Sequence, residues 1–371
     1  MYPCGSKLAN IDWYIEYRGH VNAVQSIRVK ANLQILIYMC QGTQRGEKME
    51  SQVNDILSKI EENAARVVIG KREVTRFLLA AAAAGGHVLL EDVPGTGKTV
   101  LAKSIAKSMG CRFDRIQFTP DLLPSDVTGL SFFNQEKNAF TFQQGPVFTN
   151  ILLADEINRA TPRTQSSLLE CMAEGQVTVD GVTRRLEAPF FVIATQNPVE
   201  TIGCFPLPEA QLDRFIMKIS MGGLDSAQER QMLDRFIVEE PLATLEAVCT
   251  DKDIRQLQQA CREVSVHTDL RDYIVALVQA TRSHRGLVSG GGSSIVNQGV
   301  SPRGTLALLR ASQGFALVNG RDYVVPEDIK AVAIPVMAHR LIGEIQEEQK
   351  AVVIQGLLDS VPVPTEDWTK R

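Results

Sequence analysis

The sequence lacks long apolar stretches, a leader segment and patterned cysteines, and each absence excludes a class of protein. Its longest apolar run, Phe77 to Ala84, has eight residues, fewer than the roughly 18 that a membrane-spanning helix needs. No basic segment leads into an apolar one at the start of the chain, so no secretory signal is visible. The seven cysteines are scattered without a Cys-x-x-Cys pair. This argues against a disulfide framework or a structural zinc site and predicts a reducing, cytoplasmic location.

The sequence also has no excess of basic residues. Lys+Arg number 39 and Asp+Glu 43, a formal net charge of −4, which weakens any interpretation based on nucleic-acid affinity. Hydrophobic residues make up 44% and charged residues 22% of the 371 residues. These fractions are close to the average of soluble globular proteins and exclude a disordered or fibrous chain. The length predicts two or three domains.

Residues 1–50 differ from the rest of the chain. They contain Trp13 and four of the six tyrosines and show no sustained helical or strand period. Apolar residues at helical spacing start only beyond Ser51. We interpret Met49 as the natural start and residues 1–48 as an extension of the gene model, and the alternative is a genuine N-terminal arm.

Helices and strands alternate from residue 51 to residue 222. The pattern predicts helices over 53–64, 71–84 and 99–109 and strands over 87–90, 113–118, 150–154 and 190–195. Such alternation is typical of a parallel sheet covered by helices on both faces. Two hairpins interrupt it, at 131–142 and at 176–187, where Asp180-Gly181 is a strong turn signal.

A helical region follows Gly222-Gly223. Helical spacing predicts helices over 225–238, 251–264, 269–284, 303–319 and 327–341, with a Gly/Ser-rich loop at 289–299. We therefore expect an α/β domain at 51–222, an all-α domain at 223–363 and a C-terminal tail at 364–371.

A glycine-rich segment between a predicted strand and a predicted helix carries the clearest chemical signal. It reads Pro94-Gly95-Thr96-Gly97-Lys98-Thr99. Its glycines let backbone N–H groups approach phosphates, and the following helix presents its positive end to them. The lysine would reach the β- and γ-phosphates of a nucleoside triphosphate, and the threonine hydroxyl would hold Mg²⁺. Asp92 replaces the first glycine of the strict pattern, and the alternative is a glycine turn without function.

Polar residues end two further apolar strands. Asp155 and Glu156 follow Ile151-Leu152-Leu153-Ala154. Asp155 fits the metal-side acid of a phosphate-loop enzyme, and Glu156 fits a base that orients the attacking water. Asn197 ends the strand at 190–195 and would emerge beside the γ-phosphate if the strands are neighbours. Taken alone, the acidic pair is also compatible with a helix cap, and Asn197-Pro198 with a turn.

Five motifs occur in an order that resembles one known family. They are Gly-Thr-Gly-Lys-Thr, Leu-Leu-Ala-Asp-Glu-Ile-Asn-Arg-Ala, Ala-Thr-Gln-Asn-Pro, Leu-Pro-Glu-Ala-Gln-Leu-Asp-Arg-Phe and Ser-Pro-Arg-Gly. Together they resemble the MoxR family of AAA+ ATPases over about residues 51–345. The resemblance implies an AAA+ core with a five-stranded parallel sheet, a helix-2 insert, a hairpin before the sensor strand, and a helical lid.

The resemblance also implies roles for individual residues. Asn197 would be sensor 1, Arg214 the arginine finger offered to a neighbouring subunit, and Arg303 the sensor 2 of the lid. Val68 and Gly70 would border the adenine, and the nucleotide contacts would run from Pro94 through Gly95, Thr96, Gly97, Lys98 and Thr99 to Val100. Taken alone, Asp213-Arg214 is more typical of a surface ion pair.

Two features leave the roles of the arginines open. Arg159 and Arg163 follow Glu156 closely and could compete for the interfacial role. A Gly/Ser-rich insertion precedes Ser301-Pro302-Arg303, which leaves open where Arg303 lies and whether it acts on its own or a neighbouring nucleotide.

Other candidates are weaker. The five histidines have no metal-ligand spacing, and we interpret His87 as structural. We expect the phenylalanines of the first hairpin to pack internally, and the alternative is that a solvent-facing subset contacts a client; they are Phe132, Phe133, Phe140, Phe142 and Phe148.

The leading functional hypothesis is an ATPase that uses ATP and Mg²⁺ and assembles into a ring. The resemblance implies a hexamer that remodels or matures a protein client, with metal-cofactor insertion and a von Willebrand factor A domain partner as known themes. Two alternatives stay open, a nucleic-acid-associated motor and a chelatase-type nucleotide switch. We expect no membrane span.

Overall fold

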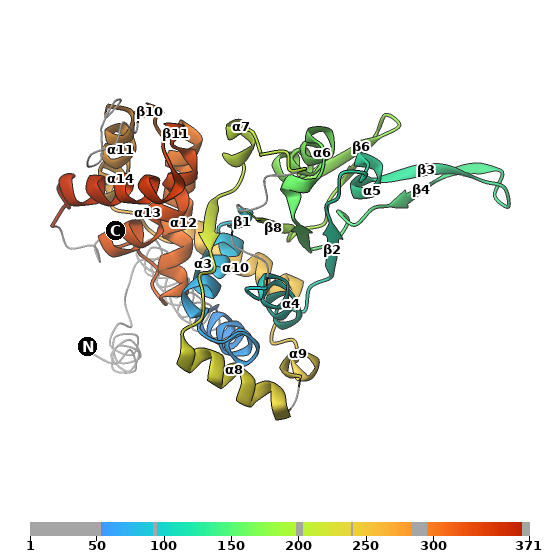
Figure 1. Ribbon diagram of the computed structural model, residues 1–371, viewed down its shortest axis with the longest axis horizontal. Coiled ribbons are helices and arrows are strands. Elements are labelled where there is room, and N and C mark those ends of the chain that lie inside the picture. Colours follow the sequence, from blue (N-terminus) through green and yellow to red (C-terminus); the bar gives the residue numbers. More distant parts are fainter. Residues whose placement is uncertain (1–52, 92–94, 198–202, 239, 284–294, 366–371) are drawn as a thin grey trace, which may run out of the picture. The chain divides into compact units, whose positions relative to one another are not determined.

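A computed structural model describes residues 53–365, apart from 92–94, 198–202, 239 and 284–294 (Figure 1). The predicted extension at 1–48 and most of the predicted tail at 364–371 lie outside the described residues. Within the described ranges, every helix is too short or too polar to cross a membrane.

The centre of the fold is a sheet of five parallel strands. In spatial order they are β2 (Phe113–Gln117), β5 (Ile151–Asp155), β8 (Phe191–Gln196), β1 (Val88–Glu91) and β9 (Met217–Ser220). Four of these strands match the apolar runs of the sequence. The fifth, β9, is only four residues long and carries Lys218, so no periodicity marked it. The sheet confirms the predicted α/β class.

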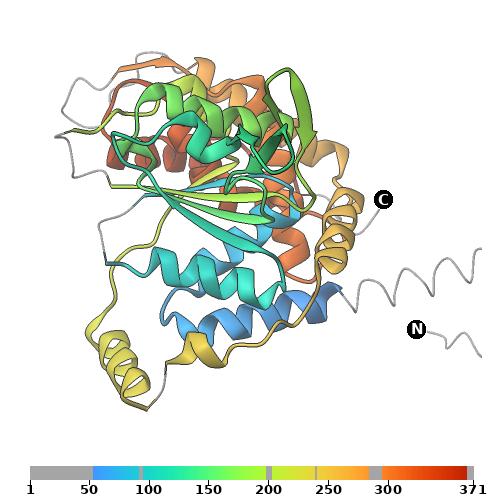
Figure 2. The same cartoon turned by 90° about the vertical axis from the view of Figure 1, so that its right-hand side faces the viewer.

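Alternating residues of the central strands fill two separate cores. Val88 and Leu90 of β1 belong to one buried cluster, whereas Leu89 belongs to the other, as the two-residue period of a strand requires. Helices α3 (Arg72–Ala83) and α4 (Lys98–Ser108) cover the first face, and α6 (Pro162–Glu174) covers the second (Figure 2). Continuous apolar strands are thus explained by burial on both faces.

Both predicted hairpins are present. The first pairs β3 (Gly129–Asn134) with β4 (Ala139–Gln144), follows the short helix α5 (Pro124–Thr128) and extends away from the sheet (Figure 1). The second pairs β6 (Gln176–Val179) with β7 (Val182–Arg185) through Asp180-Gly181, both of which have positive φ. Positive φ at both central residues is the geometry of the type I′ turn that the sequence predicts.

The C-terminal region is mainly helical, as predicted, with one short β-pair. Its helices are α8 (Ser226–Val238), α9 (Pro241–Thr244), α10 (Asp251–Glu263), α11 (Thr268–Ser283), α12 (Pro302–Val318), α13 (Pro326–Met337), the 3₁₀ turn η2 (Ala338–Arg340) and α14 (Glu347–Ser360). Two differences from the prediction stand out. The segment 295–298, expected in a loop, is strand β10 (Ile295–Gln298) and pairs with β11 (Ile342–Glu344), and α14 had no sequence prediction. The helix predicted at 327–341 ends at Met337, after the internal Pro335.

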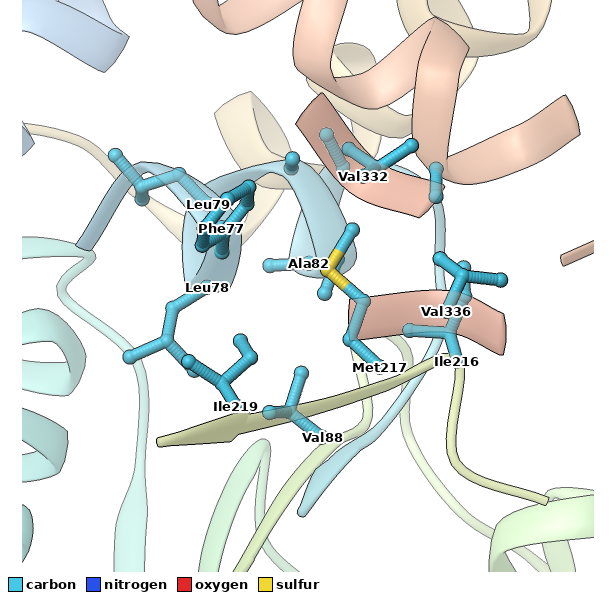
Figure 3. Close-up of a cluster of buried hydrophobic side chains, with 14 of the residues drawn as sticks. Phe77, Leu78, Leu79, Ala82, Val88, Ile216, Met217, Ile219, Val332 and Val336 are labelled. Atoms are coloured by element: carbon cyan, nitrogen blue, oxygen red, sulfur yellow. The ribbon is translucent and has the colours of Figure 1, made fainter. Parts of the chain in front are cut away.

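The C-terminal helices share a buried core with the sheet. Figure 3 shows Leu78 of α3, Val88 of β1 and Ile219 of β9 in one cluster with Val332 and Val336 of α13. Because side chains from both sides of residue 222 belong to this cluster, the predicted domain boundary stays a prediction.

Gly314 sets the distance between α12 and α3. A Cβ atom built on Gly314 would lie 2.3 Å from the carbonyl oxygen of Ala80, a backbone atom that cannot swing away. Gly356 of α14 offers a contrast, because a Cβ atom there has nothing within 4 Å.

We therefore expect opposite effects from alanine at these two glycines. Gly314→Ala should destabilise the fold by about 1–3 kcal/mol through overpacking, which outweighs the helix propensity of alanine. Gly356→Ala should stabilise it by about 0.5–1 kcal/mol, because glycine is a poor helix former. The measurement is the thermal unfolding midpoint of each variant, and an unchanged midpoint for Gly314→Ala would contradict the close packing.

His87 joins three elements at the amino end of β1. The backbone N–H of Val192 in β8 donates to its Nδ1 at 3.1 Å. Its Nε2 therefore carries the hydrogen and donates to the carbonyl of Met172 in α6 at 3.1 Å. Burial lowers the pKa of His87 from 6.5 to about 4, and the hydrogen bond to Met172 opposes the shift. The side chain is structural, as predicted.

This environment makes stability depend on pH. The unfolded chain binds a proton near pH 6.5, whereas folded His87 resists one until about pH 4. The free energy of unfolding should therefore fall as the pH drops from 6.5 towards 4, with about 2 kcal/mol lost from this residue at pH 5. Urea unfolding of wild type and His87→Gln at pH 7.5 and 5 checks this. The variant should be less sensitive to acid than wild type, and equal sensitivity would refute the assignment.

Candidate active site

The phosphate loop lies between β1 and α4. Gly95 and Gly97 have φ of 85° and 87°, which favours glycine. A Cβ atom at either glycine would have nothing within 4 Å, so the open side of the loop faces free space. Lys98 and Thr99 form the first turn of α4, and their N–H groups and the helix end favour an anion. Pro94 lies outside the described residues.

An apolar pocket of about 400 Å³ adjoins this loop. Val68 and Val100 line it together with Gly95, Thr96 and Gly97, so the structure brings five of the predicted nucleotide contacts together. Its other walls come mainly from Val67, Ile69, Leu224, Met232 and Phe236. Apolar walls beside a phosphate cradle fit a base and its phosphates.

Two residues close to Val68 in the chain, Gly70 and Lys71, also shape this pocket. Lys71 donates to the carbonyls of Gly222 and Gly223 at 2.7 and 2.6 Å, which fixes the turn before α8. Gly70, predicted to border the adenine, packs against α8: a Cβ atom there would meet the side chain of Gln228 at 2.7 Å. Gly70 therefore lets α8 approach the pocket.

Asp155 lies at the end of β5, facing α4. Its Oδ2 is 3.4 Å from the hydroxyl of Thr99, which donates to it, and its Oδ1 accepts from Thr195 at 2.6 Å. These oxygens are ligands that Mg²⁺ prefers. In the described part of the chain, no cluster of three or more His, Cys, Asp or Glu side chains could hold a metal ion. Thr99 and Asp155 therefore fit a metal ion that takes its other ligands from phosphates and water.

Glu156 is held in an unusual backbone conformation. Its φ of 55° lies in the left-handed region, which is costly for a non-glycine residue and is found at functional sites. The backbone N–H of Glu156 donates to Thr195 at 2.9 Å, and its carboxylate accepts from Gln117 at 2.7 Å. Arg159 pairs with the same carboxylate oxygen at 3.1 Å, so its guanidinium group contacts the acidic pair of its own chain.

Strand β2 supplies two residues that the sequence analysis missed. Arg115 donates to Oδ2 of Asp155 at 2.7 and 3.1 Å, and to Gln117 at 2.8 Å. Gln117 then bonds Glu156, so β2 holds both acidic side chains. The spacing of Arg115 and Gln117, two apart at the end of a strand, was the available signal, because such residues share one face.

Asn197 follows β8 next to the acidic pair. It is 4% exposed, and its carbonyl accepts from Asn158 at 3.4 Å. Because β8 pairs with β5 in parallel, the residues after both strands meet at one edge of the sheet. The structure thus gathers Asn197, Asp155 and Glu156 as predicted from strand order.

A chain of charged and polar groups continues along this edge. Glu91, at the end of β1, accepts from Gln196 and pairs with Lys218 of β9 at 2.5 Å. Lys218 also pairs with Glu347, in the first turn of α14, at 2.9 Å. The inner pair is largely buried, with side-chain exposures of 11% and 17%, whereas Glu347 is 47% exposed. The phosphate-loop strand is thereby connected to the last helix.

Arg214 and Arg303 lie elsewhere, in a second pocket of about 330 Å³. Four arginines line this pocket and Asp213 is its one acidic lining residue; they are Arg214, Arg303, Arg310 and Arg340. The local pattern suggested a surface ion pair between Asp213 and Arg214, and this pair does not form in the described structure. Asp213 pairs with Arg340 at 2.7 Å. In the described ranges, neither Arg214 nor Arg303 forms an ion pair.

The two pockets lie at opposite ends of the same strand. The second pocket is lined by His87, just before β1, and Ile216, just before β9. The phosphate loop follows the other end of β1, and the four residues of that strand span roughly 13 Å. Arg214 therefore lies at the edge of the sheet opposite the phosphate loop of its own chain.

Comparison with known proteins identifies the family. Residues 87–217 match the family model described as ATPase family associated with various cellular activities (AAA), and residues 293–355 match an AAA lid domain. An uncharacterised Bacillus subtilis protein, YeaC, is 46% identical over 85% of this chain and 98% of its own length. The chaperone MoxR1 of Mycobacterium tuberculosis is 41% identical over 81% of this chain and 80% of its own. Protein MoxR of Methylorubrum extorquens is 32% identical over 86% and 98%.

The chain belongs to the MoxR family of AAA+ ATPases. A crystal structure of a candidate ATPase from Cytophaga hutchinsonii superposes with a TM-score of 0.79 at 38% identity, covering 87% of this chain and 99% of that one. As a MoxR-family member the chain is an ATPase and binds nucleotide. The phosphate loop and the acidic pair described above lie inside the matched AAA region, and Arg303 and Arg340 lie inside the matched lid.

Proposed function

We propose that this chain is a Mg²⁺-dependent ATPase whose catalytic site is completed by a second copy of the chain. The copies form a closed ring, and the family resemblance implies six subunits. One observation carries the proposal: the phosphate loop and the acidic pair lie at one edge of the sheet, and Arg214 and Arg303 at the other. A subunit that offers its arginine pocket to the phosphate loop of the next subunit still has its own phosphate loop open on the other side. In a closed ring, every phosphate loop meets the arginine pocket of a neighbour.

The chain's own residues divide the chemistry among them. Lys98 would neutralise phosphate charge, Thr99 and Asp155 would hold a metal ion, and Glu156 would orient the attacking water. Asn197 lies beside Glu156 and positions the same water. Held there, Mg²⁺ would supply positive charge against the charge that develops on the phosphates.

Charge supports the assignment of Arg214 and Arg303 to a neighbour's nucleotide. Four guanidinium groups around one carboxylate repel one another, and the positive charge of Arg303 contributes to lowering the pKa of Arg340, although burial is the larger cause. An incoming phosphate relieves that repulsion. Arg159 remains with Glu156 of its own subunit.

We further propose that the ring remodels a protein client, since a relative of 41% identity is named a chaperone. The contact surface is the tip of the β3–β4 hairpin, where three phenylalanines are 40% to 76% exposed; they are Phe132, Phe133 and Phe140. The rings of Phe142 and Phe148 pack against each other at the base of the hairpin, with 5.7 Å between their centroids. A von Willebrand factor A domain partner, metal-cofactor insertion and a cytoplasmic location remain part of this proposal.

The first test is ATP hydrolysis against protein concentration for wild type, Glu156→Gln and Arg214→Ala. Specific activity of the wild type should rise with concentration, because the site needs two subunits. Arg214→Ala should lose about 10³-fold or more in rate while it still binds ATP, because a finger in trans acts on the transition state. Glu156→Gln should bind ATP without hydrolysing it. Activity that is linear in concentration and insensitive to Arg214→Ala would refute the assignment of Arg214 as the finger in trans and point to Arg159 or Arg163.

The hairpin is tested with Phe133→Ser/Phe140→Ser. This double variant should lose the ATP-dependent suppression of light scattering by heat-denatured citrate synthase, because exposed apolar patches bind unfolded chains. Its basal ATPase should stay within about twofold of wild type, since exposed substitutions perturb the fold little. Val182→Ser, an equally exposed apolar position on β7, is the matched control. Equal suppression by the double variant and the control would place the client contact elsewhere.

A further inference from the structure

The arginine pocket is built around a buried ion pair that nucleotide chemistry does not explain. Arg340, at the end of η2, has only 2% of its side chain exposed. Its Nε donates to Oδ1 of Asp213 at 2.7 Å, and its Nη2 donates to the carbonyl of Phe215 at 2.6 Å. Its Nη1 donates to the carbonyls of Ile216, at 3.3 Å, and of Val336. The guanidinium therefore fastens the whole segment 213–216 to the lid.

The other oxygen of Asp213 reaches the helix that carries Arg303. Ser301 donates from its hydroxyl to Oδ2 of Asp213 at 3.0 Å. The same hydroxyl caps α12 by accepting from the N–H of Gly304 at 3.2 Å. Arg303 lies between Ser301 and Gly304, so the cap that Asp213 orients also sets the direction of Arg303.

The first turn of α12 packs closely against Arg340. A Cβ atom on Gly304 would lie 2.3 Å from Val300 and 2.9 Å from the Cδ of Arg340. Arg214 is fixed from its other side, because its Nη1 donates to the carbonyl of Leu169 in α6 at 2.9 Å. One carboxylate thus joins the chain next to Arg214 to the cap next to Arg303.

We propose that Asp213 and Arg340 are positioning residues that hold Arg214 and Arg303 in one fixed constellation for the nucleotide of the neighbouring subunit. The proposal rests on the shared site proposed above. Both oxygens of Asp213 are engaged by Arg340 and Ser301, which prevents Asp213 from neutralising Arg214. Removing the carboxylate takes away the support that segment 213–216 and the α12 cap share, and a small displacement of such groups costs about 10²-fold in rate.

The variants Asp213→Asn, Ser301→Ala and Ser301→Thr test this in steady-state hydrolysis. Asp213→Asn should lower kcat about tenfold or more and change KM for ATP less than about threefold, because the subunit's own nucleotide pocket is untouched. Ser301→Ala should lower kcat in the same way, and Ser301→Thr, which keeps the hydroxyl, should restore it. The matched control is Asp328→Asn, which breaks an equally buried ion pair in the lid, Arg321–Asp328 at 2.5 Å, without touching segment 213–216. Its thermal midpoint should fall while kcat stays near wild type.

Mixed assemblies separate positioning in trans from a general loss of stability. Subunits with Lys98→Ala have an intact arginine pocket but no working phosphate loop, and Asp213→Asn subunits have the reverse. Their mixture should hydrolyse ATP faster than the sum of the two alone. A kcat of Asp213→Asn near wild type would overturn the proposal. So would a failure to complement when Arg214→Ala and Lys98→Ala do complement. If that reference mixture also fails, the shared site itself is refuted.

Discussion

Parallel pairing of β1 with β8 and β9 is the constraint on which the rest of the structure depends. Because the five strands of the central sheet run the same way, a residue that follows one of them lies at one edge of the sheet and a residue that precedes one lies at the other. The phosphate loop, the acidic pair and Asn197 follow strands. His87 and Arg214 precede them. The chemistry is therefore split by topology before any side chain contact is considered.

The two edges differ in how their charges are paired. At the carboxyl edge, Asp155 and Glu156 are compensated by Arg115, Arg159 and Gln117. At the amino edge, guanidinium groups outnumber carboxylates, and Asp213 is already engaged by Arg340 and Ser301. In the shared site that we propose, the arginines of this edge face the phosphates of a nucleotide bound to the next subunit.

The sequence was most informative where physical signals are local. Apolar runs marked four strands, Asp180-Gly181 marked a turn, and the glycine loop marked the phosphate site. The missing parts depend on distant partners. Strand β10 forms only against β11, and Asp213 meets Arg340 across 127 positions, so no spacing rule reveals either. Arg115 and Gln117 resembled ordinary polar residues of an edge strand until the register placed them beside Asp155 and Glu156.

The chain of charges through Lys218 is not uniform, and this has a mechanical consequence. Its inner contact, Glu91–Lys218, is shielded from solvent, whereas Glu347 is half exposed. Water and salt weaken an exposed ion pair much more than a shielded one. The inner ion pair, Glu91–Lys218, therefore holds β1 and β9 together, and the outer ion pair, Lys218–Glu347, breaks at a lower free-energy cost. A movement of α14 would therefore break the outer contact and leave the pairing of β1 with β9 intact.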